Sequence, residues 1–324
     1  MAARIEPAPI TGEVVDLRQI AGAELDPLLD EEIDLWQRNL RWDFRKSADL
    51  VRRFVDMRAL SGCALLRRRS VVGYAYFVNE DQKALIGDLY VRHAVRTPEA
   101  EQILLATVLA DAFHSPHVRR IEAQLMMMAA EPGGSLPAAQ HMRAFERNFM
   151  LLEGLSRLSL PRGRAAASAH IERWTDPFQE QAAHLIAAAY ATHIDSQIND
   201  QYRSVTGARR FLYNIVQYPG CGTFTKAASL AAFEPQSGRM LGICLSSLIG
   251  PQTGHITQIC VTPAAQGTGV GYDLLRRSLE ALRDCGCKDA SLTVTADNAE
   301  AVRLYERVGF RTTRKFLALA WEGF

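Results

Sequence analysis

The stretch Gln266-Gly267-Thr268-Gly269-Val270-Gly271 decides how the rest of this chain is interpreted. It follows the apolar run Ile259-Cys260-Val261 and leads into residues 270–284, where leucines recur at helical spacing. This order predicts a strand, a glycine turn and the start of a helix. The first amides of a helix have no partner within it, and the helix dipole makes that end partly positive. Because glycines let a backbone approach a ligand closely, the stretch predicts a cradle for phosphate groups.

Two other phosphate-binding loops fit this stretch less well. A Walker-type loop is excluded because no Lys-Ser or Lys-Thr follows the glycines. A dinucleotide-binding turn would use Gly267 and Gly269, with Asp297 at the end of the next apolar strand, but Tyr272 occupies the third glycine position. A glycine turn with a purely structural role is the remaining alternative.

A second block, further along the chain, points to one phosphate ligand. The pattern Val261-x-Pro263-x-x-Gln266-x-x-Gly269-x-Gly271 is followed by Asp297-Asn298-x-x-Ala301-x-x-Leu304-Tyr305-x-x-x-Gly309-Phe310. Together they resemble the acyl-CoA pyrophosphate loop and the closing helix of the GNAT superfamily of N-acetyltransferases. The resemblance covers about residues 170–324. It implies an α+β fold, with a mixed, mostly antiparallel central sheet flanked by helices, and acetyl-CoA as co-substrate.

The composition is that of a globular protein. The chain has 324 residues, enough for two domains, with 48% hydrophobic and 23% charged residues. A net charge of +1 gives no electrostatic reason to expect nucleic acid or a membrane surface as partner. No apolar run reaches membrane-spanning length, and the first residues lack the apolar core of a signal peptide. The six cysteines are scattered, and Cys285-x-Cys287 lacks the second pair of a zinc site. We therefore expect a cytoplasmic protein with reduced thiols and no metal.

The two halves of the chain show one pattern, which indicates a duplication. A small-residue stretch at 161–168 reads as a linker, so we expect a degenerate GNAT-like domain over 1–165 and an acetyl-CoA-binding GNAT domain over 166–324. This tandem layout is similar to that of the mycothiol synthases. The first half is expected to contain helices at 24–58, 99–114 and 138–149, and strands at 13–18, 63–68, 71–79, 84–91 and 121–128.

The two copies are chemically unequal. Registering Val91 on Val261 gives the following pairs: Leu85 with His255, Glu99 with Gly269, Glu101 with Gly271, and, from the second block, Phe145 with Tyr305. Two carboxylates would repel a pyrophosphate, and their side chains would obstruct its approach. We therefore expect the first half to keep the fold and to have lost acyl-CoA binding.

The resemblance implies how the second half holds its co-substrate. A bulge near Gln258 or Ile259 would open the strand so that the main chain of Ile259 and Val261 bonds the pantetheine arm and an amide polarises the acetyl carbonyl. Asn298 matches the asparagine that contacts this arm, although it equally suits a helix start. The expected cofactor-binding residues are Ile259, Cys260, Val261, Gln266, Gly267, Thr268, Gly269, Val270, Gly271, Asn298, Ala301 and Tyr305.

Two residues are candidates for catalysis. In the family, the tyrosine at the position of Tyr305 donates a proton to the departing CoA sulfur, and an unperturbed phenol is protonated at neutral pH. A packing aromatic on an amphipathic helix is the alternative. His255 lies where some members carry a glutamate base, and an imidazole can take up a proton near pH 7. A lone histidine beside a turn glycine, Gly254, can equally be a satisfied surface residue, and many relatives use no fixed base.

The expected activity is transfer of an acetyl group to a primary amine of a small molecule. An aperiodic stretch between the first helices of the second half suits the acceptor site; its polar and aromatic members are Tyr190, His193, Asp195, Gln197, Asn199, Asp200 and Tyr202. The second candidate is a non-catalytic acyl-CoA-binding sensor or assembly module. No nucleic-acid or membrane partner is expected, and both a monomer and a homodimer fit two fused copies.

Overall fold

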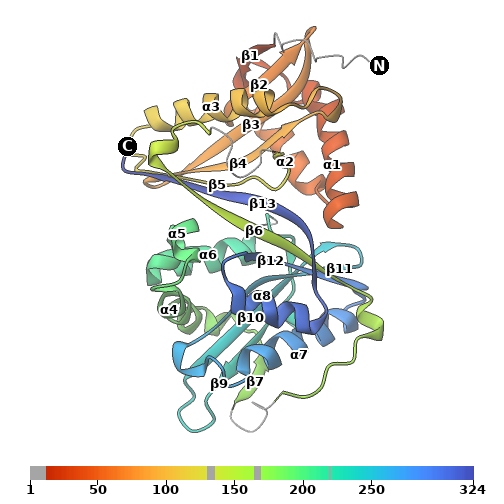
Figure 1. The fold of residues 1–324 in the computed structure, drawn as a ribbon, viewed down its shortest axis with the longest axis vertical. Helices are drawn as coiled ribbons and strands as arrows, with labels where there is room; N and C mark the ends of the chain where they lie inside the picture. Colours follow the sequence, from red (N-terminus) through yellow and green to blue (C-terminus); the bar gives the residue numbers. More distant parts are fainter. Residues whose placement is uncertain (1–11, 130–135, 164–168, 219) are drawn as a thin grey trace, which may run out of the picture. The chain divides into compact units, whose positions relative to one another are not determined.

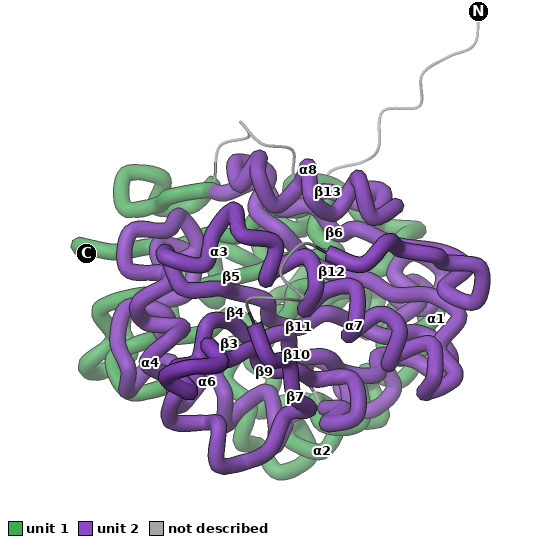
Figure 2. Tube along the Cα trace, turned by 90° about the horizontal axis from the view of Figure 1, so that it is seen from below, with its two compact units in different colours: residues 1–34, 48–144, 316–324 green, residues 35–47, 145–315 purple. Residues whose placement is uncertain are grey.

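The chain folds into two compact units, which Figure 2 shows in different colours. The structure is a computed structural model that describes residues 12–129, 136–163, 169–218 and 220–324. Unit 1 comprises Met1–Asp34, Ala48–Ala144 and Phe316–Phe324. Unit 2 comprises Leu35–Ser47 and Phe145–Lys315. No helix in the described ranges combines the length and apolar character that crossing a bilayer requires.

Unit 1 is built on a mostly antiparallel sheet with the strand order β1-β2-β3-β4-β5-β13. Its strands are β1 (Glu13–Asp16), β2 (Ser61–Arg67), β3 (Ser70–Glu80), β4 (Lys83–Val91), β5 (Arg120–Gln124) and the end of β13 (Arg311–Glu322). Its helices are α3 (Pro98–His114), the first part of α1 (Asp26–Leu40) and most of α2 (Arg45–Asp56); the end of α1 and the start of α2 belong to unit 2. Only β4 and β5 pair in parallel within this described sheet. The apolar side of α3, with Leu104 and Val108, packs on the sheet and forms the core.

Unit 2 repeats this plan with the strand order β6-β12-β11-β10-β9-β7. Its strands are β6 (Met142–Glu153), β7 (His170–Arg173), β8 (Thr223–Phe224), β9 (Leu230–Phe233), β10 (Met240–Gly250), β11 (Thr253–Val261) and β12 (Asp289–Thr295). Its helices are α4 (Gln179–Tyr190), α5 (Asp195–Ile198), α6 (Val205–Gln217), α7 (Val270–Asp284) and α8 (Ala299–Val308). One core lies between the sheet and α7 and α8, and another lies between the sheet and α4 and α6. The predicted class, a mixed and mostly antiparallel sheet flanked by helices, is confirmed for both units.

The last strand of each sheet comes from the other half of the sequence. Figure 1 shows the blue strand β13 beside β5 and the yellow-green strand β6 beside β12. Ala318 of β13 pairs with Gln124, and Phe149 of β6 pairs with Thr293. The units therefore do not follow the predicted division into 1–165 and 166–324. Residues 164–168 of the predicted linker lie outside the described residues.

The prediction of a helix over residues 138–149 is wrong. Ala139–His141 form a 3-10 turn, and strand β6 begins at Met142. The continuous apolar run Phe149–Leu152 is typical of a strand buried on both faces, which periodicity alone does not separate from a buried helix. The expected match of Phe145 with Tyr305 fails for the same reason, because Phe145 lies on a strand and Tyr305 on α8. The described residues of unit 1 contain no counterpart of α8 after β5.

The expected register of Val91 on Val261 agrees with the strand pairing. Gly73 is the partner of Val91 in unit 1, and Gly242 is the partner of Val261 in unit 2. Both strands also carry an irregularity at the same point, since the pairing skips Gly87 in β4 and Thr257 in β11. The predicted bulge is therefore present, one residue before Gln258.

The strand position that follows the bulge in unit 1 holds a buried acid. The Tyr74 hydroxyl lies 2.9 Å from Glu32 Oε2 and 3.0 Å from Asp88 Oδ2, and both carboxyl groups are buried. The Tyr74 hydroxyl has one proton, so it can donate a hydrogen bond to only one of these two carboxyl oxygens. Burial raises the pKa of Asp88, opposed by hydrogen bonds from Glu32, Tyr74 and the Leu89 amide.

We expect Asp88→Asn to gain stability relative to the wild type as pH rises from 5 to 8. The folded state keeps the Asp88 proton to higher pH than the unfolded state, so this group's stabilisation is complete below its unfolded pKa and is lost as pH rises through the folded pKa. The asparagine side chain cannot ionise and has nearly the same shape as the protonated acid. Thermal unfolding at both pH values measures the change. An equal difference between variant and wild type at pH 5 and pH 8 would contradict a raised pKa at Asp88.

Candidate active site

A cleft of about 650 Å³ opens in unit 2 where two parallel strands part. Strands β11 and β12 pair from Thr253 with Asp289 as far as Ile256 with Leu292. Beyond that point β12 continues against β6 up to Thr295, and β11 continues against β10 up to Val261. The volume falls within the range of small-molecule sites.

The main chain of Ile259 and Val261 faces this opening. The Thr262 amide donates to the Leu241 carbonyl at 2.8 Å, and hydrogen-bonded pairs alternate along an antiparallel ladder. Cys260 and Gln258 therefore bond with β10 through their main chain. The amide and carbonyl groups of Ile259 and Val261 point to the opposite side, from which β12 has parted. An edge of this kind can pair with an extended ligand.

The glycine turn lies at the end of β11 and leads into α7. Gly267 has a φ of 72° and Gly269, the N-cap of α7, a φ of 95°, conformations that favour glycine. The first bond of the helix runs from the Asp273 amide to the Gly269 carbonyl. The amides of residues 270–272 thus precede the hydrogen-bond ladder of α7, where an anion can accept from them.

The corresponding turn of unit 1 is chemically different. Helix α3 begins at Pro98 with Thr97 as N-cap, and the Thr97 hydroxyl already accepts the Ala100 amide. The carboxylate of Glu101 is buried, accepts the Ala129 amide at 3.0 Å and pairs with Arg96 at 2.7 Å. A carboxylate, with Arg96 and the Ala129 amide as its partners, therefore stands at the position where unit 2 has Gly271.

Helix α8 and its N-cap bring three of the predicted residues to the cleft: Asn298, Ala301 and Tyr305. Asn298 is its N-cap, because its Oδ1 accepts the Ala301 amide at 3.3 Å, so the alternative of a helix-start residue is correct at least in part. Tyr305 is 7% exposed and lies two turns further along α8, where it also lines the cleft. Burial raises the pKa of the Tyr305 phenol, and the thiols and carboxylate around it add to the effect. The phenol is therefore protonated at neutral pH.

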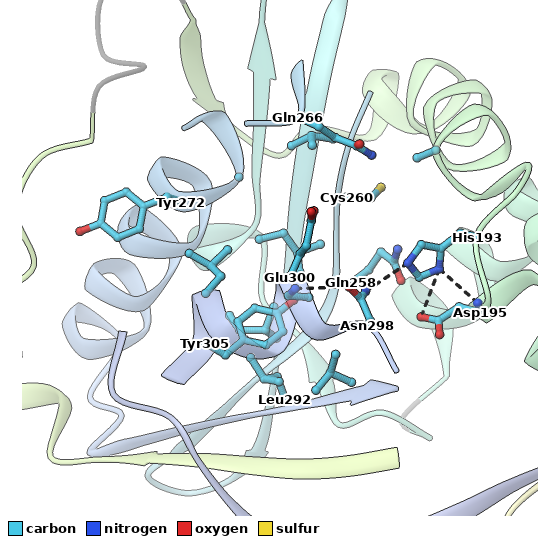
Figure 3. A pocket seen from close by; sticks show the side chains of 18 of the residues that line it. His193, Asp195, Gln258, Cys260, Gln266, Tyr272, Leu292, Asn298, Glu300 and Tyr305 are labelled. Atoms are coloured by element: carbon cyan, nitrogen blue, oxygen red, sulfur yellow. Dashed lines mark hydrogen bonds and ion pairs between the residues drawn. The ribbon is translucent and has the colours of Figure 1, made fainter. Parts of the chain in front are cut away.

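The opposite wall of the cleft comes from α4 and the loop after it. Gln258 donates from Nε2 to the Tyr190 hydroxyl at 2.7 Å and accepts from the Tyr202 hydroxyl at 3.2 Å. Figure 3 shows His193 and Asn298 directed toward each other, with His193 Nε2 and Asn298 Nδ2 3.1 Å apart. His193 Nδ1 accepts the Asp195 amide at 3.1 Å, and the Asp195 carboxylate accepts the Thr295 hydroxyl.

Most of the residues expected from the sequence meet in this cleft. Those that line it are Tyr190, His193, Asp195, Tyr202, Ile259, Cys260, Val261, Gln266, Gly267, Gly269, Gly271, Asn298, Ala301 and Tyr305. Thr268 and Val270 do not line it: the Thr268 hydroxyl donates to the Ala265 carbonyl at 2.7 Å, and the Val270 side chain is buried in the core. Gln197, Asn199 and Asp200, from the expected acceptor stretch, also lie outside the lining.

The side chain of His255 does not face the cleft, so the prediction of a catalytic base at this position is wrong. Its ring is buried, lies 5.2 Å from Trp42 and stacks on Phe149 at 6.3 Å between ring centroids. Its Nδ1 lies 2.9 Å from the Ser291 hydroxyl. Burial lowers the pKa of His255 to about 4, which keeps the ring neutral and away from proton exchange at neutral pH. Residues 35–47, which include Trp42, cover the face of the sheet that carries His255. This packing could not be predicted from the sequence.

Two cleft residues carried no functional signal in the sequence. Gln258 was visible as a polar interruption of an apolar strand, and it proves to tie Tyr190 and Tyr202 together. Arg147 lines the cleft from β6, within the segment that was expected to be a helix of the other half. Its contribution requires the strand exchange and could not be found from local pattern.

We expect His255→Leu, which copies Leu85 of unit 1, to leave any transfer rate unchanged. The loss of one buried hydrogen bond should cost about 1 kcal/mol of stability near pH 7. His255 is neutral in the folded protein down to about pH 4. Its stabilising effect is therefore complete above the unfolded pKa of about 6.5 and is lost as pH falls toward 4, by about 3 kcal/mol. The variant should show a flatter fall in melting temperature between pH 6.5 and 4. A large drop in turnover with an unchanged melting temperature would return His255 to the mechanism.

Comparison with known proteins agrees with this geometry. Residues 196–310 match the model of the Acetyltransferase (GNAT) family. These residues run from α5 to the turn after α8 and so include the parted strands, the glycine turn and Tyr305.

Similar curated proteins are mycothiol acetyltransferases. The chain is 37% identical over 91 residues to one from Mycobacterium sp. (strain JLS), which covers 27% of this chain and 30% of that protein. It is 48% identical over 58 residues to one from Parafrankia sp. (strain EAN1pec), 18% of each chain. These alignments span less than a third of the length of the relatives.

Solved structures share the fold along nearly the whole chain. A GCN5-related N-acetyltransferase from Sphaerobacter thermophilus aligns with a TM-score of 0.67 at 17% identity, over 97% of this chain and 96% of that one. A tandem GNAT protein from the clavulanic acid biosynthesis pathway aligns with a TM-score of 0.56 at 14% identity, over 96% and 98%. Identities this low show the fold alone. The match to the GNAT family of acetyltransferases thus lies within unit 2, on the residues that form the cleft.

Proposed function

We propose that this chain transfers an acetyl group from acetyl-CoA to a primary amine of a small molecule, with unit 2 as the active unit. The observation that carries the proposal is the parting of β11 from β12, which leaves the main chain of Ile259 and Val261 facing the cleft beside the glycine turn. The family match to acetyltransferases and the mycothiol acetyltransferase relatives support the reaction class.

The residues present fit coenzyme A. The amides at the start of α7 and the turn glycines suit a diphosphate, and the side-chain amide of Gln266 adds an uncharged donor at the cleft. The edge at Ile259 and Val261 suits the amide groups of a pantetheine arm. When bound, acetyl-CoA supplies the acetyl group as a thioester. An amide on β11 would polarise its carbonyl.

Tyr305 is the proposed acid. Its buried phenol holds its proton throughout the neutral range, and it lines the cleft from the wall opposite His193. We assign the acceptor ammonium to the corner of His193 and Asp195, where the carboxylate attracts it.

We expect purified protein with acetyl-CoA and a panel of primary amines to release thiol steadily. Tyr305→Phe removes one hydroxyl and keeps the ring that packs near Phe310, at 6.1 Å between centroids. It should lower the turnover number about 100-fold, because general acids contribute on that order. Acetyl-CoA affinity should be nearly intact. Thiol release and calorimetric titration measure the two effects.

Tyr213→Phe is the matched control for this substitution. Tyr213 lies on α6, its side chain is exposed, and it does not line the cleft. This control should turn over at close to the wild-type rate. An unchanged rate in Tyr305→Phe would remove Tyr305 from the mechanism. Tight CoA binding by the wild type without turnover on any amine would favour the second candidate, a non-catalytic acyl-CoA sensor.

We also propose that unit 1 binds no acyl-CoA, because the Thr97 hydroxyl already accepts the Ala100 amide and the Glu101 carboxylate stands at the position of Gly271. Titration of acetyl-CoA into the full chain should therefore give one site per chain. Gly269→Glu, which copies Glu99 at the matching position, should abolish that site by placing a charged side chain at the N-cap of α7. Two sites per chain, or one site that survives Gly269→Glu in a folded variant, would contradict the assignment to unit 2.

A further inference from the structure

Three arginines line the cleft of unit 2, Arg147, Arg303 and Arg307, and the proposed reaction uses none of them. Of these, Arg147 comes from the sheet. Arg147 lies on β6 directly opposite Thr295 of β12, and its side chain lines the cleft. Its Nε is buried without a hydrogen-bond partner, and no ion pair of Arg147 occurs within the described ranges of the chain. The residue as a whole is only half-buried, so its terminal nitrogens remain available to an anion in the cleft.

Strand register places Arg147 on the acceptor side of the sheet. Residues directly opposite each other share a face, so Arg147 and Thr295 lie on the face that also holds Phe149 and Ser291, the neighbours of His255. The alternate residues of these strands, such as Met150 and Leu292, belong to the core beneath α7 and α8. Helix α7, which begins at the glycine turn, packs on that other face. Arg147 is therefore poorly placed for the diphosphate of coenzyme A.

The neighbours of Arg147 are a carboxylate and two phenols. Thr295, its cross-strand partner, donates its hydroxyl to the Asp195 carboxylate, which also lines the cleft. Burial raises the pKa of Tyr202 and of Tyr305, and the charge of Arg147 opposes the shift in both, so the guanidinium is close to both phenols. A carboxylate and an unpaired guanidinium thus stand at one end of the cleft, with the proposed acid nearby.

We propose that the acceptor is an amine that also carries an oxyanion, a carboxylate or a phosphate, which Arg147 binds while Asp195 and His193 hold the amino group. This rests on the proposed function and names the class of its acceptor. The planar fork of arginine offers two parallel donors to either oxyanion. Because the two binding groups adjoin the same residue, Thr295, the amine and the anion should be close together in the molecule, as they are in an amino acid.

The test compares acceptors that differ only in their anion. Each of the common amino acids is assayed against its amide, and 2-aminoethyl phosphate against ethanolamine, with thiol release as the readout. We expect higher kcat/KM for the charged member of at least one pair. Preference for amino acids over 2-aminoethyl phosphate, or the reverse, identifies the oxyanion. Equal kcat/KM within every pair would overturn the proposal.

Arg147→Gln should lower kcat/KM for the preferred anionic amine about 10- to 100-fold, as expected for the loss of a charge-assisted hydrogen bond. The KM for acetyl-CoA and the rate with the uncharged partner should change less than about threefold. The matched control is Arg311→Gln, which removes an exposed cation at the start of β13. An equal loss with both acceptors, or a rise in the KM for acetyl-CoA, would show that Arg147 serves the fold or coenzyme A instead.

A binding experiment separates this inference from the proposed function. If the wild type acetylates no amine, the proposed transfer fails, and the same ligand pairs are then followed by the shift in melting temperature of the full chain with CoA present. Stabilisation by the anionic member alone, lost in Arg147→Gln and kept in Arg311→Gln, would support the anion site without catalysis. No difference between the members of any pair would refute it.

Discussion

The structure of unit 2 depends on the point at which β11 and β12 stop pairing. Up to Ile256 and Leu292 the two strands form an ordinary parallel ladder, and beyond it each keeps only its outer neighbour. A main-chain amide or carbonyl left without a partner costs free energy unless water or a ligand satisfies it. The skipped residue Thr257 turns the strand at this point, and the glycine turn that follows leads into α7. The cleft is thus built into the sheet and does not depend on side chains alone.

Unit 1 has a similar arrangement of strands and helices but carries different polar residues at the matching positions. Both units carry the strand irregularity, the single parallel pair and the helix after the turn. At the position of Gln258, which ties two phenols, unit 1 has Asp88, which shares the Tyr74 hydroxyl with Glu32. Where unit 2 has Gly271, unit 1 has Glu101 with its own cation. In unit 1 these polar side chains form hydrogen bonds and ion pairs with one another. In unit 2 several of the polar groups face the cleft instead.

Local pattern predicted the parts of this site that are continuous in sequence. Short stretches of sequence specify the glycine turn, the strand before it and the helix with Tyr305. These elements also follow one another along the chain. The wrong predictions concern residues whose neighbours in the structure are distant in the sequence. His255 is a plausible base on its strand, and only the packing of Trp42 and Phe149 excludes it. Residues 138–149 have a short apolar run that suits either a helix or a doubly buried strand, and the apparent echo of Tyr305–Phe310 favoured the wrong one.

The exchange of β6 and β13 has a consequence for what the C-terminal half can do alone. A fragment beginning at residue 166 would retain the glycine turn and Tyr305 but would lack β6, the strand that pairs with β12 along its whole length. Its sheet would then end at β12, with an unpaired edge beside the cleft. It would also lack Arg147, and it would lack Trp42, which covers His255. Residues of the N-terminal half therefore supply structure and a charged side chain to unit 2. This is a physical reason for two unequal copies to stay in one chain.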